Sequence, residues 1–214
     1  MFRNKFFLTG IFLILLTVIY FTFFDSGNTT SSSGLEATVN PDTYARAFSD
    51  ERRKKDEFFR SDPESPFRDK SVFKPLTYFA PDPAYRVVAR LEPFADKTQR
   101  LVVPLTDGTQ ETYEKYAHAV FSLGGEACRV LLLKQGDKLH LLFKDATSGK
   151  ETYGGGRYVD FDLDDVADNR LLIDFNTAYN PYCAYNYEYA CPLPPAENTL
   201  PVAVRAGETY TNKE

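Results

Sequence analysis

The chain has 214 residues, of which 25 are Lys or Arg and 30 are Asp or Glu, and it contains three cysteines and no tryptophan. A net charge of −5 has the wrong sign for binding a polyanion, which argues against DNA or RNA as a partner. Beyond an N-terminal apolar segment and a polar linker, about 170 residues remain, enough for one well-buried core and too few for two ordinary domains.

The first 24 residues are predicted to form a short cytoplasmic tip and a transmembrane anchor. The run from Phe6 to Phe24 has 19 residues and no charge, nearly enough to cross a hydrocarbon core of about 30 Å. Arg3 and Lys5 precede it and Asp25 follows, so the positive-inside rule keeps the N-terminus in the cytoplasm and exports the rest, into the periplasm if the cell has two membranes. A cleaved signal peptide is the alternative, but its apolar stretch is usually about 7–15 residues long and ends in an A-x-A-like site, which this run lacks.

Residues 25–39 are rich in Ser, Thr, Gly and Asn, and they predict a flexible polar tether. A single globular domain is expected over residues 40–214. At its start, Asn40 is followed by a proline, and apolar side chains then recur at helical spacing. This pattern predicts one amphipathic helix from about Pro41 to Arg60.

The exported part is acidic. Removing Arg3 and Lys5 from the 25 bases leaves 23 against 30 acids, a net charge of −7. The one dense basic cluster, residues 52–55, is flanked by Asp and Glu, which indicates a solvated helix face and not a polyanion site. The expected partners are therefore the membrane, through the N-terminal helix, and a small ligand, but no nucleic acid.

Eight short runs rich in β-branched and aromatic residues follow the helix, separated by turn signals such as Asp107-Gly108. No gap between them is long enough for crossover helices. The predicted fold is therefore mainly β, an antiparallel β-barrel or β-sandwich with one N-terminal amphipathic helix. Residues 131–133 and 141–143 are apolar throughout, which predicts a hairpin in the middle of the core. The predicted strands are Leu76–Ala80, Tyr85–Leu91, Leu101–Leu105, Tyr116–Leu123, Cys128–Leu133, Leu139–Phe143, Arg157–Phe161 and Leu171–Phe175.

Two stretches near the C-terminus interleave polar with aromatic residues and lack a simple period. Residues 143–158 contain YGGGRY, and residues 174–198 contain DFNTAYNP and CPLPPAEN. These motifs resemble the signature of a bacterial domain-of-unknown-function family, number sixteen-eighty-four, and the similarity runs from about Tyr44 to Tyr210. The resemblance implies a family whose activity is undefined, so it implies no mechanism. Any chemistry is expected between Lys144 and Asn198.

Cys183 and Cys191 bound a loop in this region. In an exported domain such a pair most simply forms a disulfide, worth roughly 2–3 kcal/mol, and a role as free thiols or metal ligands is the alternative. No metal site and no cofactor are predicted, because C-x7-C is not a zinc spacing and the two histidines, His118 and His140, fall in predicted strands away from the cysteines. Cys128 begins a strand and is expected to be a buried thiol.

A set of polar residues is predicted to bind a small polar or anionic ligand. The glycines before Arg157 could form an anion-binding nest beside the guanidinium, although a bulge or a close backbone approach would use the same glycines. Carboxylates and amides among tyrosines suit a carbohydrate or another polar molecule, but Asn and Asp also satisfy the backbone of irregular loops. A partly buried Asp160 or Asp174 would need Arg157 as its partner. The predicted ligand-binding residues are Arg157, Asp174, Asn176, Asn180, Glu197 and Asn198.

Three hypotheses about function follow. The first is a membrane-anchored extracytoplasmic domain that binds such a ligand. The second is a hydrolase or thiol-dependent enzyme with Cys183 as nucleophile or Glu197 as acid/base, for which the sequence offers no histidine partner. The third is a structural envelope protein without a ligand. Convergence of Arg157, Asp174, Asn180 and Glu197 on one concavity would favour the first two, whereas separate hydrogen-bonded loops would favour the third.

Overall fold

The computed structural model describes residues 40–210. The predicted anchor at residues 6–24 and the predicted tether at residues 25–39 lie outside this part of the chain. Between Asn40 and Tyr210, no helix has the length and apolar character needed to cross a membrane.

The one α-helix of the described residues, α2, runs from Pro41 to Ser61 and is the predicted amphipathic helix. Asn40 caps it, because its Oδ1 accepts hydrogen bonds from the backbone N of Asp42 at 3.0 Å and of Thr43 at 3.3 Å. The helix ends at Asp62, which precedes a proline and is extended. The start of the helix is therefore set by the residue that predicted it, and its end lies one residue beyond the predicted Arg60.

Seven strands form one antiparallel sheet in the order β6-β5-β4-β3-β1-β7, and β2 also pairs with β3. The predicted strand at residues 76–80 is wrong, because only Tyr78 makes an isolated bridge there, to Glu208. Prolines at positions 75 and 81 flank this segment, and proline cannot donate to a ladder. The strands are β1 (Arg86–Pro93), β2 (Arg100–Pro104), β3 (Gln110–Leu123), β4 (Glu126–Gln135), β5 (Lys138–Phe143), β6 (Arg157–Asp162) and β7 (Arg170–Asp174).

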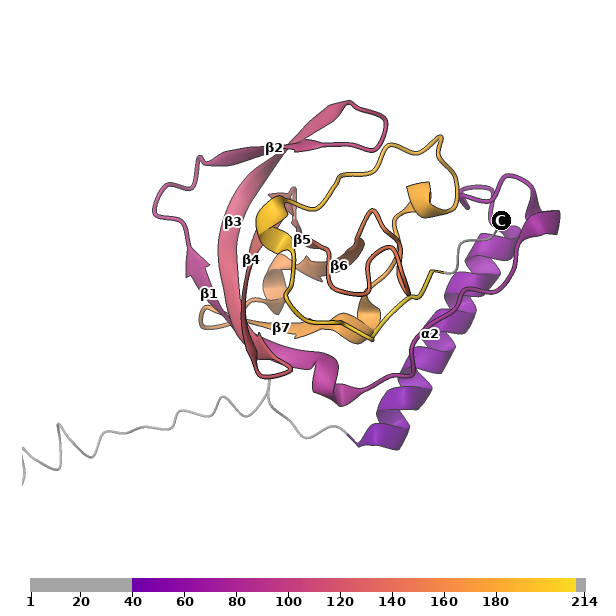
Figure 1. The fold of residues 1–214 in the computed structure, drawn as a ribbon, viewed down its shortest axis with the longest axis horizontal. Helices are drawn as coiled ribbons and strands as arrows, with labels where there is room; N and C mark the ends of the chain where they lie inside the picture. Colours follow the sequence, from indigo (N-terminus) through magenta and orange to yellow (C-terminus); the bar gives the residue numbers. More distant parts are fainter. Residues whose placement is uncertain (1–39, 211–214) are drawn as a thin grey trace, which may run out of the picture. The chain divides into compact units, whose positions relative to one another are not determined.

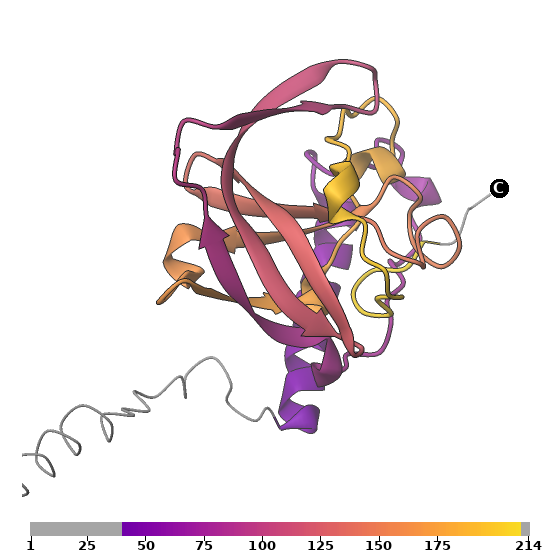
Figure 2. The same ribbon diagram turned by 60° about the vertical axis from the view of Figure 1, so that its left-hand side comes forward.

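The sheet curls into a nearly closed barrel, one of the two predicted architectures. Its terminal strands, β6 and β7, do not pair with each other. Instead, the chain that leaves β7 returns at Tyr179, which exchanges two backbone hydrogen bonds of 2.9 and 3.0 Å with Tyr158 of β6. Figures 1 and 2 show β3 and β4 bending around the molecule while β2 crosses one end of it.

Apolar side chains pack on both faces of the central strands. Leu132 and Phe143 lie in the main core, whereas Leu131 and Leu142 belong to a second cluster on the opposite face. All four are 2% exposed or less. The predicted central hairpin, β4–β5, is therefore confirmed, and its turn places Gly136 at a φ of 59°, a region that favours glycine.

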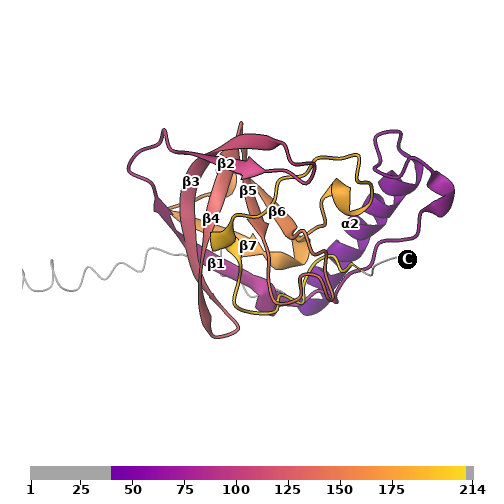
Figure 3. The same cartoon turned by 45° about the horizontal axis from the view of Figure 1, so that its top comes forward.

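Helix α2 lies along one side of the barrel, beside the C-terminal segments and away from the bend of β3 (Figures 1 and 3). Phe59 is buried on its inner face. The prediction that the basic cluster of the helix is fully solvated is wrong in part. Arg52 is half-buried, with its guanidinium 4.3 Å from the ring centroid of Tyr78, and Lys55 forms an ion pair with Glu208. Because four consecutive helical residues point in different directions, the basic cluster contributes side chains both to the exposed face of α2 and to the face that packs on the barrel.

Candidate functional site

Arg157 lies at the centre of a buried clamp. Its side chain is 0% exposed, and its Nη2 donates to Asp145 Oδ2 at 2.8 Å and to the carbonyl of Val204 at 2.7 Å. Its Nη1 donates to the carbonyls of Ala206 and Glu208. Burial lowers the pKa of Arg157, and the negative charge of Asp145 opposes that shift. The guanidinium therefore fastens the C-terminal segment to the barrel.

The predicted pairing of Arg157 with Asp160 or Asp174 is wrong. Residues three apart on a strand point to opposite faces, so Asp160 faces away from Arg157. Its carboxylate instead lies 2.7 Å from His140 Nδ1 and accepts a hydrogen bond of 2.5 Å from the Tyr179 hydroxyl. The partner of Arg157 comes from the turn that follows β5.

The glycines before Arg157 serve close packing. Gly156 has a φ of 100°, and a Cβ there would lie 2.7 Å from the carbonyl oxygen of Phe143. Its N–H already donates to the carbonyl of Tyr153 at 3.0 Å. At Gly155 a Cβ would overlap the Tyr153 ring. This geometry supports the close-approach alternative over the anion-binding nest.

Asp174 and Asn176 tie the start of α2 to the end of β7. The Tyr44 hydroxyl donates to Asp174 Oδ2 at 2.7 Å. Asn176 Nδ2 donates to the Tyr44 hydroxyl at 2.9 Å and to the carbonyl of Asp82 at 2.8 Å. Burial and the neighbouring Asp174 raise the pKa of Tyr44. Both predicted ligand-binding residues thus have partners within the protein.

Asn180 belongs to a network around Glu208, a carboxylate that is 1% exposed. Glu208 Oε2 accepts hydrogen bonds from the backbone N of Asn180 at 2.8 Å and from the Tyr185 hydroxyl at 2.6 Å. Its Oε1 accepts from Lys55 and, at 3.4 Å, from the Tyr78 hydroxyl. Burial, followed by the charge of Glu208, raises the pKa of Tyr185. The network joins α2, the loop after Asn180 and the C-terminal segment.

Asn198 fills a gap between two strands. The β4–β5 ladder stops at the pair Leu133 and His140. Beyond it, Asn198 Oδ1 accepts from the backbone N of Leu131 at 2.6 Å, and its Nδ2 donates to the carbonyls of Leu131 and Leu142 at 2.9 and 2.8 Å. With 0% exposure, this amide replaces ladder hydrogen bonds and has no free edge for a ligand.

Glu197 has the histidine neighbour that the sequence did not reveal, since its Oε2 lies 2.9 Å from His118 Nε2. Arg129 Nη2 lies 2.8 Å from His118 Nδ1. A guanidinium can only donate, so Nδ1 accepts and Nε2 carries the proton that Glu197 accepts. Both ring nitrogens are used within the protein, and this pair therefore presents no free general base.

The six predicted ligand-binding residues do not converge on one concavity. They lie in separate hydrogen-bonded groups: around Asp145, around Tyr44, around Glu208, beside His118 of β3, and between β4 and β5. In each group they connect elements of the fold, which is the arrangement that favours a structural role for these six residues. Sequence reasoning also missed Asp145, Lys55 and Glu208. Of these three, only Asp145 had a signal in the sequence, because it lies inside the first signature stretch, residues 143–158.

Two surface grooves are lined by other residues. The first, which we call the tyrosine groove, has a volume of about 680 Å³ and lies between the C-terminal half of α2 and the loop of residues 179–192. No Asp or Glu occurs in the lining that the described residues form. The lining consists of Lys54, Lys55, Phe58, Phe59, Tyr158, Tyr179, Pro181, Tyr182, Tyr189, Ala190, Cys191 and Pro192.

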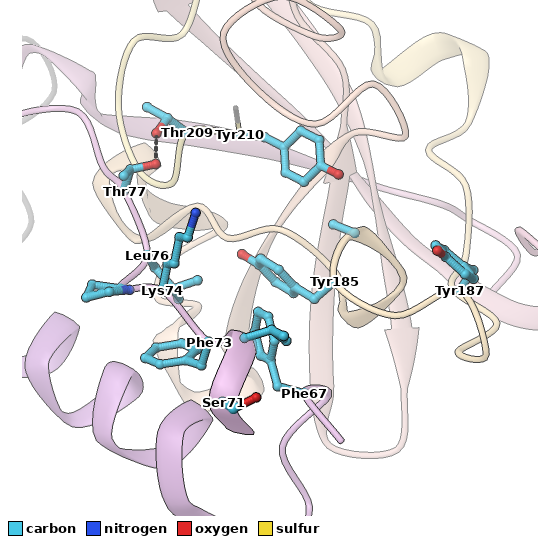
Figure 4. A pocket seen from close by; sticks show the side chains of 13 residues that line it. Phe67, Ser71, Phe73, Lys74, Leu76, Thr77, Tyr185, Tyr187, Thr209 and Tyr210 are labelled. Atoms are coloured by element: carbon cyan, nitrogen blue, oxygen red, sulfur yellow. Dashed lines mark hydrogen bonds between the residues drawn. The ribbon is translucent and has the colours of Figure 1, made fainter. Parts of the chain in front are cut away.

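The second groove, of about 600 Å³, lies between residues 67–77 and the other side of the same loop. Figure 4 shows Phe67 and Phe73 gathered beside Tyr185, with Phe67 centred 5.2 Å from Phe73 and 5.5 Å from Tyr185. Lys74 supplies its one charged side chain among the described residues, and Tyr210, the last described residue, lines it too.

Cys183 and Cys191 are neighbouring thiols, so the structure does not support the predicted disulfide. A hydrogen bond from Cys191, helped by Thr106 and Tyr153 and opposed by burial, lowers the pKa of Cys183 to about 7. The same contact, together with burial, raises the pKa of Cys191. Cys128, as predicted, is a buried thiol, and burial raises its pKa.

Comparisons with known proteins give a family and a fold relative. Residues 71–209 match the model of a family described as "Protein of unknown function (DUF1684)". Among solved structures, the chain is similar to an uncharacterized protein from gene locus rrnAC0354 of Haloarcula marismortui, determined by solution NMR. The identity is 34% and the TM-score 0.63, over 81% of this chain and 97% of that chain. Among curated proteins, none matches.

Proposed function

Because the chain belongs to the DUF1684 family, whose function is unknown, we propose a function from its geometry: it binds a small amphiphile, with an apolar body and one anionic group, in the tyrosine groove. The observation that carries this proposal is the lining, in which aromatic rings form the walls and two lysines are the charged groups. The proposal keeps the predicted anionic ligand and moves its site from the signature residues to α2 and the loop of residues 179–192.

The walls of the tyrosine groove suit an apolar body. Tyr182 packs edge to face against Tyr189, with ring centroids 5.3 Å apart, and against Phe59, with centroids 5.9 Å apart. Concave, mostly apolar sites of about 300–1,000 Å³ are usual for small molecules. Each buried methylene contributes about 0.8 kcal/mol, so a chain of several methylenes supplies most of the driving force.

The charge of the groove favours an anionic group. Lys55 is already paired with Glu208, and its Nζ lies 4.9 Å from the ring centroid of Tyr179. The ion pairs that α2 makes within the described residues use Arg53 and Lys55 and leave Lys54 without a carboxylate partner there. Lys54 therefore supplies an uncompensated positive charge to which a carboxylate or phosphate can bind.

Decanoate is expected to bind with a Kd on the order of tens of micromolar, and 1-decanol more weakly. A fragment that begins at Asn40 suits isothermal titration calorimetry, because residues 38–214 form a compact unit of their own and the solved relative is covered over 97% of its length. Lys54→Gln should weaken decanoate binding about two- to fivefold, the range of an exposed ion pair, without changing decanol binding. Ala190→Trp, which places a ring in the groove, should abolish both.

The matched control is Lys74→Gln, since Lys74 lines the second groove. This variant is expected to bind decanoate as the unmodified fragment does. If instead it weakens binding and Ala190→Trp leaves binding intact, the ligand occupies the second groove and the proposal is wrong. Absence of any heat of binding with decanoate would also refute it.

We also propose that residues 6–24 anchor the chain and hold this domain on the outer side of the membrane, where amphiphiles are abundant. The support is the uncharged run after Arg3 and Lys5. Protease added to intact spheroplasts that express the chain should cut residues 25–39 and release the domain. Digestion only after lysis would show that the domain faces the cytoplasm.

A further inference from the structure

The backbone holds Cys183 and Cys191 side by side. Cys183 lies in a 3-10 turn, Tyr182–Ala184, and its N–H donates to Cys191 Sγ at 3.1 Å. Cys191 is fixed from the other side, because its N–H donates to Thr106 Oγ1 at 3.0 Å and its carbonyl accepts from the Thr106 N–H at 3.0 Å. The two thiols are thus held in contact without a covalent bond, and Cys191 lines the tyrosine groove.

We propose that Cys183 and Cys191 form a redox-active dithiol, which reduces a low-molecular-weight disulfide admitted through the tyrosine groove and itself closes to an intramolecular disulfide. The inference uses the groove as an entrance and does not depend on amphiphile binding. It differs from a permanent structural disulfide because the dithiol is the resting form and the bond is made and broken in turnover.

The exchange needs no other reactant. Cys183 first loses its proton to water, and the Cys191 thiol then passes its own proton to the Cys183 thiolate, which leaves a thiolate on Cys191, at the groove. This thiolate attacks one sulfur of R–S–S–R, the S–S bond breaks, and R–S⁻ leaves and takes up a proton as R–SH. Cys183 then loses its proton and attacks the Cys191 sulfur of the mixed disulfide, which expels the second R–S⁻. Two protein thiols are oxidised, and one disulfide is reduced to two thiols.

The groups around the dithiol favour a single negative charge near neutral pH. The Tyr153 hydroxyl lies 4.0 Å from Cys183 Sγ, and burial, followed by the charge of Cys183, raises its pKa to about 12, so it stays protonated and donates. Tyr158 also faces the pair, and burial raises its pKa. The pKa of about 7 for Cys183 leaves roughly half of the pairs with one negative charge at that pH, and this is the charge that proton transfer moves to Cys191.

The test uses 5,5′-dithiobis(2-nitrobenzoate), an aromatic dianionic disulfide, on the full chain carrying Cys128→Ser. Two equivalents of thionitrobenzoate should be released, the protein should lose two hydrogens by mass, and dithiothreitol should restore both thiols. In the unmodified chain this reaction should be at least on the order of tenfold faster than labelling of Cys128 at pH 7. The rate of thionitrobenzoate release should fall from its plateau at high pH to half of that value at about pH 7.

Variants separate the steps. Cys183→Ser, in the same background, should stop at a stable mixed disulfide on Cys191 after one equivalent. Ala190→Trp should slow the native reaction. Release only after unfolding in urea, or a Cys183–Cys191 pair that never closes, would overturn the inference. Cys183→Ser should still bind decanoate, because Cys183 does not line the tyrosine groove, so either proposal can fail without the other.

Discussion

Arg157→Met is expected to lower the free energy of unfolding by about 3–5 kcal/mol, the usual cost of removing one partner from a buried ion pair. The variant leaves Asp145 charged in a site where both side chains are 0% exposed. It also removes the donors to the carbonyls of Val204, Ala206 and Glu208. Urea unfolding followed by circular dichroism measures the change.

Arg205→Met is the matched control, because Arg205 is an arginine of the same C-terminal segment whose bidentate pair with Glu151 is exposed. Its unfolding midpoint should hardly move. The double variant Arg157→Met, Asp145→Asn should recover part of the loss, since no unpaired charge is then buried. Equal effects of Arg157→Met and Arg205→Met would disprove the clamp.

Glu208→Gln should produce the second large effect, a loss of about 2–3 kcal/mol. The glutamine keeps the shape of the side chain but removes the negative charge that pairs with Lys55 and that accepts from Tyr185 and Asn180. We expect a smaller loss than for Arg157, because the Lys55 side chain is 28% exposed and is partly screened by water.

This loss should be localised. Because Lys55 is the ionic contact of α2 with Glu208, hydrogen exchange of the α2 amides should speed up in Glu208→Gln more than exchange in β3 and β4. Glu188→Gln, at an exposed pair with Arg68, serves as the control and should leave exchange in α2 unchanged. Uniform acceleration across the barrel would argue against a docking role for Glu208.

Local signals predicted the elements of this fold well. Asn40 before a proline marked the start of α2, because a helix terminus needs an acceptor for its free N–H groups. The apolar residues 131–133 and 141–143 marked the central hairpin, because a strand buried on both faces has no polar side. The segment at 76–80 failed since its flanking prolines outweigh its β-rich composition.

The site could not be predicted in the same way. Asp145 pairs with Arg157 across 12 positions, and Lys55 pairs with Glu208 across 153, so no local spacing connects either pair. Polar residues within long motifs suggested a ligand, yet their side chains satisfy the backbone of irregular segments. The tyrosine groove needs α2 and a loop more than 100 residues away, a juxtaposition that only the tertiary fold creates.

The most direct test of the proposed function is an NMR titration of the ¹⁵N-labelled fragment from Asn40 with decanoate. The amides of Lys54, Phe58, Tyr182 and Ala190 should shift most, with saturation at one equivalent. If the largest shifts instead occur at Arg157 and Asn198, the ligand binds at the signature residues and the proposed function is wrong.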